Sequence, residues 1–380
     1  MPTIPQALLE QFNTRFGGCP DTIWQAPGRI NLIGDHTDYQ GGLALPIAVP
    51  YGTWIAAKMR SDGDINVYSD YRNTATQLSV DLIPQAVVNR PLSGLMGFIV
   101  AVWHLLGINN GADISIMSTL PVASGLSSSA ALSLGLLAAM TDMQGTNLST
   151  RHLVSQARRI ENNYLGVDSG ILDPLAIALG KADFALVVDA LAQDGYHVPF
   201  DYAGEGQSLW IIDTLTPRRL AASGYDQRVT ETRSASERLG ISCLREATVD
   251  QVNQIADPVL RMRAQHVVWE NRRVTWTVEA AARHDFERVK QLFWESHWSL
   301  SENFEVSTPL LDQTVTWLQA MGIGARLTGA GFGGSLIALA DNGQDQEISQ
   351  LLIKRYTENG WTLPRLLEVP RPAQGLHKLK

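Results

Sequence analysis

The sequence has few cysteines, few charged residues and no long hydrophobic run, and each shortage excludes a class of protein. Its 380 residues include only two cysteines, Cys19 and Cys243, which lie far apart and form no CxxC pair. We therefore expect no disulfide framework and no zinc site, and a reducing, cytoplasmic location. The longest uncharged apolar run, near residues 125–140, is shorter than the ~20 residues that span a membrane. The first twenty residues lack the basic start and apolar run of a signal peptide, so none is expected.

The chain also lacks a surplus of positive charge. Its formal net charge is −8 and no basic stripe offsets it, so nucleic acids and anionic membranes are not expected partners. The phosphate-binding pattern G-x-x-x-x-G-K-[ST] is absent as well. What is present is a content of 45% hydrophobic and 18% charged residues, which is typical of a globular protein. The length predicts two domains.

Predicted strands and helices are mixed along the chain, which favours an α+β fold of two lobes. We place the boundary near residue 195, giving lobes at 1–195 and 196–380. A strand is expected from residue 22 to 26, ended by Pro27 and Gly28. Residues 73–92 contain two prolines and are expected to form an irregular connection.

The most informative stretch joins a loop of small residues to an apolar helix. Residues 121–125 are bend-prone, Ser127, Ser128 and Ser129 follow, and residues 130–140 carry no charge and are rich in helix formers. Unpaired N–H groups and the helix dipole make such an N-terminus a site for anions, most often phosphate. The alternative is a capped core helix that binds nothing. One residue suffices for capping, however, and three serines exceed that need.

A second stretch, residues 26–39, is dense in polar groups. Asp35, His36 and Asp38 could accept hydrogen bonds from, or donate them to, the hydroxyls of a sugar. A site built in this way discriminates against an analogue that lacks the paired hydroxyl. The alternative is a polar surface loop with an Asx-turn.

A third stretch, residues 326–334, is a glycine loop that leads into a predicted strand, residues 335–340. A dinucleotide-binding glycine loop leads into a helix, so this one does not fit that role. Its expected role is close approach to bound phosphate or sugar.

These three motifs, in this order and at these distances, resemble those of the GHMP small-molecule kinases. The first one, GRINLIGDHTDY, is similar to that of galactokinases in particular, and the resemblance covers roughly residues 22–340. It implies a two-lobed fold with a ferredoxin-like second lobe and an active site in the cleft. It also implies phosphoryl transfer from ATP, with Mg²⁺, to the anomeric hydroxyl of D-galactose. A monomer with small-molecule partners is expected.

The resemblance further implies roles for individual residues. The catalytic pair would be Asp173 and Arg29, with Arg29 stabilising the aspartate as an anion. The metal ligands would be Ser129 and Glu161. The substrate-binding residues would be Asp35, His36, Asp38, Gly170 and Tyr225. The ATP-binding residues would be Pro121, Ala123, Ser124, Gly125, Leu126, Ser127, Ser128 and Ser129.

The sequence departs from the family at several of these places. Asp35 stands where relatives have Glu, Ala123 where they have Gly, Ser169 where they have Cys and Pro174 where they have Gln. A kinase for another hexose, a pentose or a uronate is therefore an alternative reading. A sugar-sensing regulator without catalysis is a more distant one. Taken without the family, Glu161 could be an ordinary solvated acid and Tyr225 a packing residue.

Overall fold

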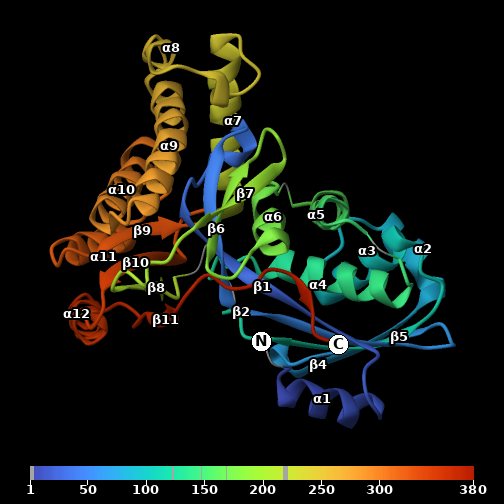
Figure 1. Cartoon of the computed structure of the whole chain (residues 1–380). Coiled ribbons are helices and arrows are strands. Elements are labelled where there is room, and N and C mark those ends of the chain that lie inside the picture. Colours follow the sequence, from blue (N-terminus) through green and yellow to red (C-terminus); the bar gives the residue numbers. More distant parts are fainter. Residues whose placement is uncertain (1–3, 122–123, 147, 168, 217–220) are drawn as a thin grey trace.

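The computed structural model describes residues 4–121, 124–146, 148–167, 169–216 and 221–380, with the side chains of residues 72 and 221–223 left aside. Figure 1 shows the helices and strands of the two sheets and the helices packed around them. Within the described residues, no helix is both long and apolar enough to cross a membrane. The α+β expectation is confirmed.

The larger sheet is built mostly from the first half of the chain, and its outer strand β12 comes from residues 377 and 378. Its strand order is β12-β1-β2-β5-β3-β4, with β6 paired to β2 and β7 paired to β6. Most neighbouring strands are antiparallel, and β3 and β5 are parallel. Its strands are β1 (Thr22–Ile33), β2 (Leu43–Met59), β3 (Asp64–Ser69), β4 (Thr74–Ser79), β5 (Ala112–Ser118), β6 (Phe184–Asp189), β7 (Asp194–Pro199) and β12 (His377–Lys378).

Helices cover both faces of this sheet. They are α1 (Gln6–Phe16), α2 (Ile83–Val88), α3 (Gly94–Leu106), α4 (Ser128–Met143), α5 (Thr150–Arg159) and α6 (Leu172–Leu179). Helix α1 lies on one side of the sheet, whereas α3 and α4 lie on the other (Figure 1). Helix α4 is buried over most of its length because it carries almost no charge and can be surrounded by apolar neighbours on all sides.

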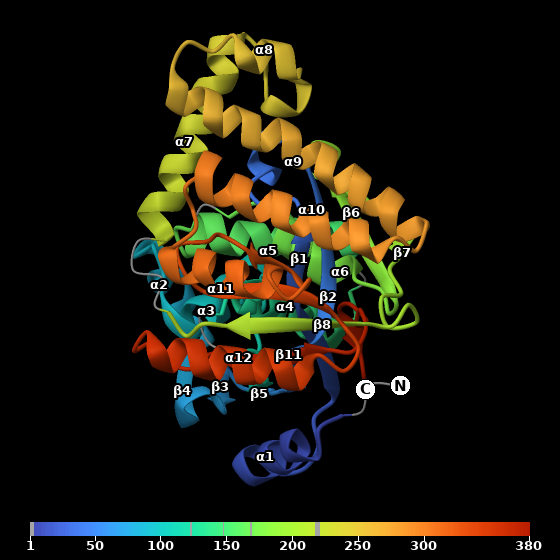
Figure 2. The same ribbon diagram turned by 90° about the vertical axis from the view of Figure 1, so that its left-hand side faces the viewer.

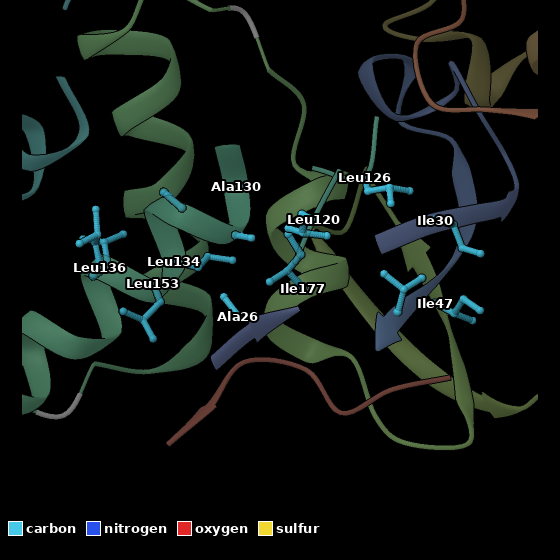
Figure 3. Packing of buried hydrophobic residues seen from close by; sticks show 14 of the residues in the cluster. Ala26, Ile30, Ile47, Leu120, Leu126, Ala130, Leu134, Leu136, Leu153 and Ile177 are labelled. Atoms are coloured by element: carbon cyan, nitrogen blue, oxygen red, sulfur yellow. The ribbon is translucent and has the colours of Figure 1, made fainter. Parts of the chain in front are cut away.

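Figure 3 shows how α4 packs. Ala130, Leu134 and Leu136 of α4 lie in one cluster with Ala26 and Ile30 of β1, and all five side chains are nearly inaccessible to solvent. Burying a large aliphatic side chain stabilises a fold by about 1.5–3 kcal/mol. This packing therefore anchors the beginning of α4, where the serine loop ends.

The second sheet is antiparallel, in the order β11-β8-β10-β9. Its strands are β8 (Gln207–Asp213), β9 (Gly324–Thr328), β10 (Ser335–Asp341) and β11 (Arg365–Val369). The longer helices around it are α7 (Ala221–Leu239), α8 (Val249–Asn253), α9 (Pro258–Ala282), α10 (Phe286–Trp298), α11 (Pro309–Gln319) and α12 (Asp345–Glu358). After the quarter turn of Figure 2, α9, α10, α11 and α12 face the viewer, stacked one above another. The domain boundary near residue 195 stays a prediction.

Two expectations from the sequence were wrong. Strand β1 does not end at Pro27; it runs to Ile33, with a shift of register between Pro27 and Arg29. The irregularity serves a close approach, because a Cβ on Gly28 would lie 2.8 Å from the carbonyl oxygen of Leu126. Residues 73–92 contain β4 and α2. Strand β4 pairs with β3 and is mostly exposed, so it lacks the alternating pattern that reveals a half-buried strand.

Candidate active site

A cavity of about 380 Å³ lies among the ends of β1, α6, α7 and the third glycine loop. Small-molecule sites are concave and carry a few convergent polar groups, and this cavity has that character. It brings together seven predicted site residues: Arg29, Asp35, His36, Asp38, Gly170, Asp173 and Tyr225. The remaining lining residues are Asn31, Gly166, Val167, Ser169, Leu172, Asp226, Gly329 and Ala330.

Asp173 is held by two donors from opposite sides. Arg29 donates from Nε (2.7 Å) and Nη2 (2.5 Å) to Oδ1, and the Ser127 hydroxyl donates to Oδ2 at 2.5 Å. Arg29 itself is buried, and its Nη1 donates to the carbonyl of Gly125 at 2.6 Å. The Asp173 side chain remains about one-third exposed, at 35%. Its carboxylate is therefore fixed in position yet open to the cavity.

The serine loop reaches the same place from the other side. Ser127 precedes α4 in a left-handed conformation, with φ 60° and ψ 44°, and its side chain does not cap the helix. Because its hydroxyl donates to Asp173 instead, it leaves the first N–H groups of α4 for a ligand. Ser128 and Ser129 follow in the exposed first turn.

Three other residues of the predicted ATP loop are buried beside these exposed serines. Pro121, Ser124 and Leu126 are buried, and Gly125 has a positive φ of 84°. Ser124 accepts a hydrogen bond at its carbonyl from the hydroxyl of Ser335 on β10 (2.7 Å), which ties this loop to the second sheet. Ala123, the remaining residue of the predicted ATP loop, lies outside the described residues.

Glu161 lies beneath the serine loop rather than in solvent. It sits in a π-helical turn, residues Ile160–Tyr164, that follows α5 directly. Such turns are rare and often occur at functional sites. The Glu161 carboxylate is 7% exposed and accepts a hydrogen bond from Ser129 at 2.6 Å. Burial raises the pKa of Glu161, and the bond from Ser129 opposes that shift. The structure thus places the predicted metal pair side by side.

Asp38 is the least engaged carboxylate of the cavity. Among the described residues, no side chain donates a hydrogen bond to it in the structure. Its carboxylate packs on the backbone of Gly170, where an added Cβ would meet Oδ2 at 1.8 Å. Burial, together with the nearby negative charge of Asp173, raises the pKa of Asp38 to about 6. Its hydrogen bonds come from the backbone of Tyr39 and of Asp38 itself, so a sugar hydroxyl could use the acceptor sites that remain.

His36 is a neutral, fully committed side chain. Burial lowers its pKa to about 4. Its Nε2 lies 3.2 Å from the carbonyl of Ala330, so Nε2 carries the hydrogen, and Nδ1 accepts from the Tyr39 hydroxyl at 2.9 Å. The ring also packs against Tyr225 and Phe304, with centroids 5.7 Å and 5.0 Å away. His36 thereby links the first motif to the third glycine loop.

Asp35 is engaged more completely than any other carboxylate in the cavity. Its Oδ1 accepts from Asn31 Nδ2 (3.0 Å) and from the backbone N–H of Gly329 (2.8 Å). Its Oδ2 accepts from Arg326 Nη2 at 2.5 Å. Only 2% of the residue is exposed. Asp35 therefore connects the end of β1 with the end of β9.

Comparison with known proteins agrees with the motifs. The model of the galactokinase galactose-binding signature matches residues 10–59, that of the GHMP kinase N-terminal domain residues 96–181 and that of the GHMP kinase C-terminal domain residues 277–356. The chain is 33% identical to the galactokinase of Streptomyces coelicolor, with 97% of each chain covered. It is 35% identical to the galactokinase of a Roseiflexus species, with 92% of this chain and 91% of the relative covered. This chain belongs to the galactokinase family.

Solved structures agree with that membership. The crystal structure of Lactococcus lactis galactokinase complexed with galactose matches with a TM-score of 0.91 and 31% identity, covering 99% of this chain and all of that one. A mevalonate kinase from Methanococcus jannaschii matches with a TM-score of 0.68 and 19% identity, over 93% of this chain and 98% of that one. The second match shows the shared GHMP kinase fold alone, which confirms the predicted fold class.

Sequence reasoning missed some functional neighbours in this galactokinase-family chain. It assigned Ser127 to ATP and did not foresee its bond to Asp173. It also treated Arg326 only as the start of a glycine loop, whereas this arginine is completely buried and pairs with Asp35. These residues lie 46 and 291 positions from their partners, so no local pattern connects them. A charged residue at the centre of an apolar strand was the only available signal for Arg326.

Proposed function

We propose that this chain transfers the γ-phosphoryl group of ATP to the anomeric hydroxyl of D-galactose, giving galactose 1-phosphate. One observation carries the proposal. The carboxylate of Asp173, oriented by Arg29 and Ser127, opens into a sugar-sized cavity beside the uncapped start of α4. A sugar in the cavity and a phosphate at the helix would meet at that carboxylate.

The reacting hydroxyl would donate to Asp173, which orients it and can take its proton. Oδ1 already accepts from Nε and Nη2 of Arg29, whereas Oδ2 accepts only from Ser127 among the described residues. Since an ionised carboxylate has about four lone-pair sites, Oδ2 keeps acceptor capacity for that hydroxyl. Arg29 places a fixed positive charge next to the reacting atoms. Phosphoryl transfer depends mostly on positioning and charge stabilisation, and the buried ion pair supplies both. Asp38 would accept from a second hydroxyl and fix the orientation of the ring.

ATP would bind with its phosphates at the start of α4, along the loop from Pro121 to Ser129. Ser129 and Glu161 fit Mg²⁺, because both offer hard oxygen ligands and Glu161 is a buried acid in hydrogen-bond contact with Ser129. No group of three or more His, Cys, Asp or Glu side chains that could hold a metal occurs among the described residues. Magnesium uses few protein ligands and completes its shell with phosphates and water. When bound, the ion would neutralise charge on the phosphates.

Two predictions from the sequence form part of the same proposal. The partners are the two small substrates, and the protein acts as a monomer in the cytoplasm. The rival substrates, another hexose, a pentose or a uronate, are outcomes of the test below. The regulator alternative is disfavoured by the assembled pair of Arg29 and Asp173.

The test is phosphorylation of a panel of hexoses, pentoses, uronates and N-acetylhexosamines with ATP and Mg²⁺. We expect galactose to give the highest kcat/KM. Asp173→Asn should lower kcat by roughly 10²–10⁴-fold, the usual contribution of a positioned acid or base, with an unchanged circular dichroism spectrum.

Asp201→Asn is the matched control, because Asp201 lies in an exposed turn and accepts only from Gly204 N–H. Near wild-type turnover in Asp173→Asn would overturn the catalytic assignment. A higher kcat/KM for another sugar would replace galactose as the substrate. ATP hydrolysis that no sugar stimulates would reject the kinase reading.

A further inference from the structure

Arg326 is completely buried, yet it does not line the sugar cavity. It lies in β9 of the second sheet and donates from Nη1 to the carbonyls of Asn31 (3.2 Å) and Leu32 (3.0 Å) at the end of β1. From Nη2 it donates to Oδ2 of Asp35. One guanidinium therefore holds both the backbone and the carboxylate of the segment that forms the cavity wall.

The surrounding charges indicate that Asp35 is the main acidic partner of Arg326. Glu270, on α9, is the nearest other carboxylate at 3.9 Å, and it already accepts from Arg273, Ser296 and the N–H of Gly34. Burial alone would raise the pKa of Glu270, but Arg273, His266, Arg326 and the bond from Ser296 together outweigh it and lower that pKa to about 2, with Arg273 the largest of these contributions. Glu270 thus has Arg273 as its own cation, and Asp35 is the closer acidic partner of Arg326.

The donors around Asp35 leave little freedom to its carboxylate. Asn31 and Gly329 occupy Oδ1, and Arg326 occupies one position on Oδ2. Since an ionised carboxylate accepts about four hydrogen bonds, Oδ2 keeps one lone pair. Asp35 lines the cavity, so that lone pair is the acceptor available to a ligand there.

We propose that Arg326 is a positioning residue for sugar recognition: it aims the last acceptor site of Asp35 at one substrate hydroxyl, and the preference for a sugar carrying that hydroxyl depends on Arg326. The inference rests on the proposed function, because it needs a sugar in the cavity. We assign this hydroxyl to the exocyclic position of the sugar, and an analogue that lacks it tests the assignment. The short side chain of Asp35 has few rotatable bonds, so the orientation of its carboxylate is set by its donors.

Lysine cannot replace arginine in this arrangement. A guanidinium presents donors in a rigid fork, whereas an ammonium is a point charge on a shorter stem. Arg326→Lys would keep the positive charge but lose the simultaneous bonds to Asn31, Leu32 and Asp35. Asp35→Glu would displace the carboxylate by one methylene from its present donors on Asn31, Gly329 and Arg326.

The experiment compares galactose with 6-deoxygalactose in the wild type, Arg326→Lys, Asp35→Asn and the double variant. Loss of one hydrogen bond to a charged group should raise the KM for galactose about tenfold to a hundredfold in Arg326→Lys. The KM for 6-deoxygalactose, and kcat for both sugars, should stay nearly unchanged, because the contact lies away from the reacting hydroxyl. Asp35→Asn should lose the same discrimination. The double variant should show the same ratio of the two KM values as Asp35→Asn alone.

Arg263→Lys is the control for losing a buried arginine. Arg263 is 2% exposed and pairs with Glu231 and Glu305. The Arg263→Lys substitution should therefore lower the melting temperature without changing the ratio of the KM values for the two sugars. An equal rise in KM for galactose and 6-deoxygalactose in Arg326→Lys would mean that Arg326 has a purely structural role, and would overturn the proposal. So would full discrimination in Asp35→Asn, an outcome that can be scored even if Arg326→Lys does not fold. A wild type that does not phosphorylate galactose would instead reject the proposed function.

Discussion

Three of the four aspartates that line the cavity, Asp35, Asp38 and Asp173, differ in the donors that their carboxylates meet. Asp35 accepts from three donors, Asp173 from Arg29 and Ser127, and Asp38 from no described side chain. A carboxylate can therefore connect two segments of the chain, orient a reacting hydroxyl or remain open to a ligand, depending on its surroundings. Residue identity alone predicted that acids gather here. It could not rank them, because the donors come from distant parts of the chain.

Asp38 should make sugar binding depend on pH. Its raised pKa of about 6 means that the carboxyl is protonated below that pH and ionised above it. Only the ionised form accepts freely from sugar hydroxyls, so kcat/KM for galactose should fall about tenfold per pH unit below about pH 6. The measurement is a pH profile of kcat/KM for the wild type and Asp38→Asn.

Asp38→Asn should lower kcat/KM throughout and remove this acidic limb. Asp70→Asn is the control, because burial also raises the pKa of Asp70, which lies in the turn before Tyr71 and outside the cavity. An acidic limb that persists in Asp38→Asn would assign it to another group.

At the scale of elements, α4 and the π-helical turn after α5 act together. The first supplies Ser129 at its exposed start, and the second turns Glu161 inward to meet it. The sequence predicted the start of α4 from its serines and its uncharged run. It did not indicate the π-turn, because helical periodicity does not reveal the extra residue of such a turn. The sequence also failed to predict the bulge in β1 and the strand β4, because both depend on pairing with another strand.

Weakening this pair should weaken metal use. Glu161→Gln and Ser129→Ala should each raise the Mg²⁺ concentration for half-maximal rate, by roughly tenfold to a hundredfold if the residues lie in or next to the ligand shell. The check is a Mg²⁺ titration at saturating galactose and fixed ATP. Glu295→Gln is the control, because Glu295 pairs with Arg288 on the exposed side of α10. An unchanged half-saturation in both variants would refute the assignment.

At the scale of the whole molecule, the chain returns to its beginning. Strand β12 pairs with β1, and the preceding residues bond to the first lobe: Ala373 N–H to Ala48, Gly375 N–H to Gly180 and Leu376 N–H to Ile177. The first sheet thus contains residues from both ends of the sequence. The two-lobe prediction treated residues 196–380 as a separate unit and did not foresee this return. A two-residue strand gives no periodic signal.

Removing residues 372–380 should destabilise the protein while leaving the cavity residues in place. Several backbone hydrogen bonds are lost, each contributing about 1 kcal/mol net, so the melting temperature should fall by roughly 5 °C or more. Thermal unfolding followed by circular dichroism measures this. Lys378→Ala, which removes only the partly exposed pair with Asp142, should change stability by under about 1 kcal/mol. Equal stability of truncated and full-length chains would contradict the structural role of the return.

That return also sets an order of events during synthesis. Until residues 377 and 378 have left the ribosome, Trp24 and Gln25 have no strand beside them on the outer side of β1. An unpaired strand edge is a template for association with other chains, so the nascent polypeptide carries such an edge until those residues have emerged. Contacts between residues so distant in sequence also form slowly. Overproduction at high temperature should therefore favour aggregation before completion, and slower translation or cooler growth should favour the folded enzyme.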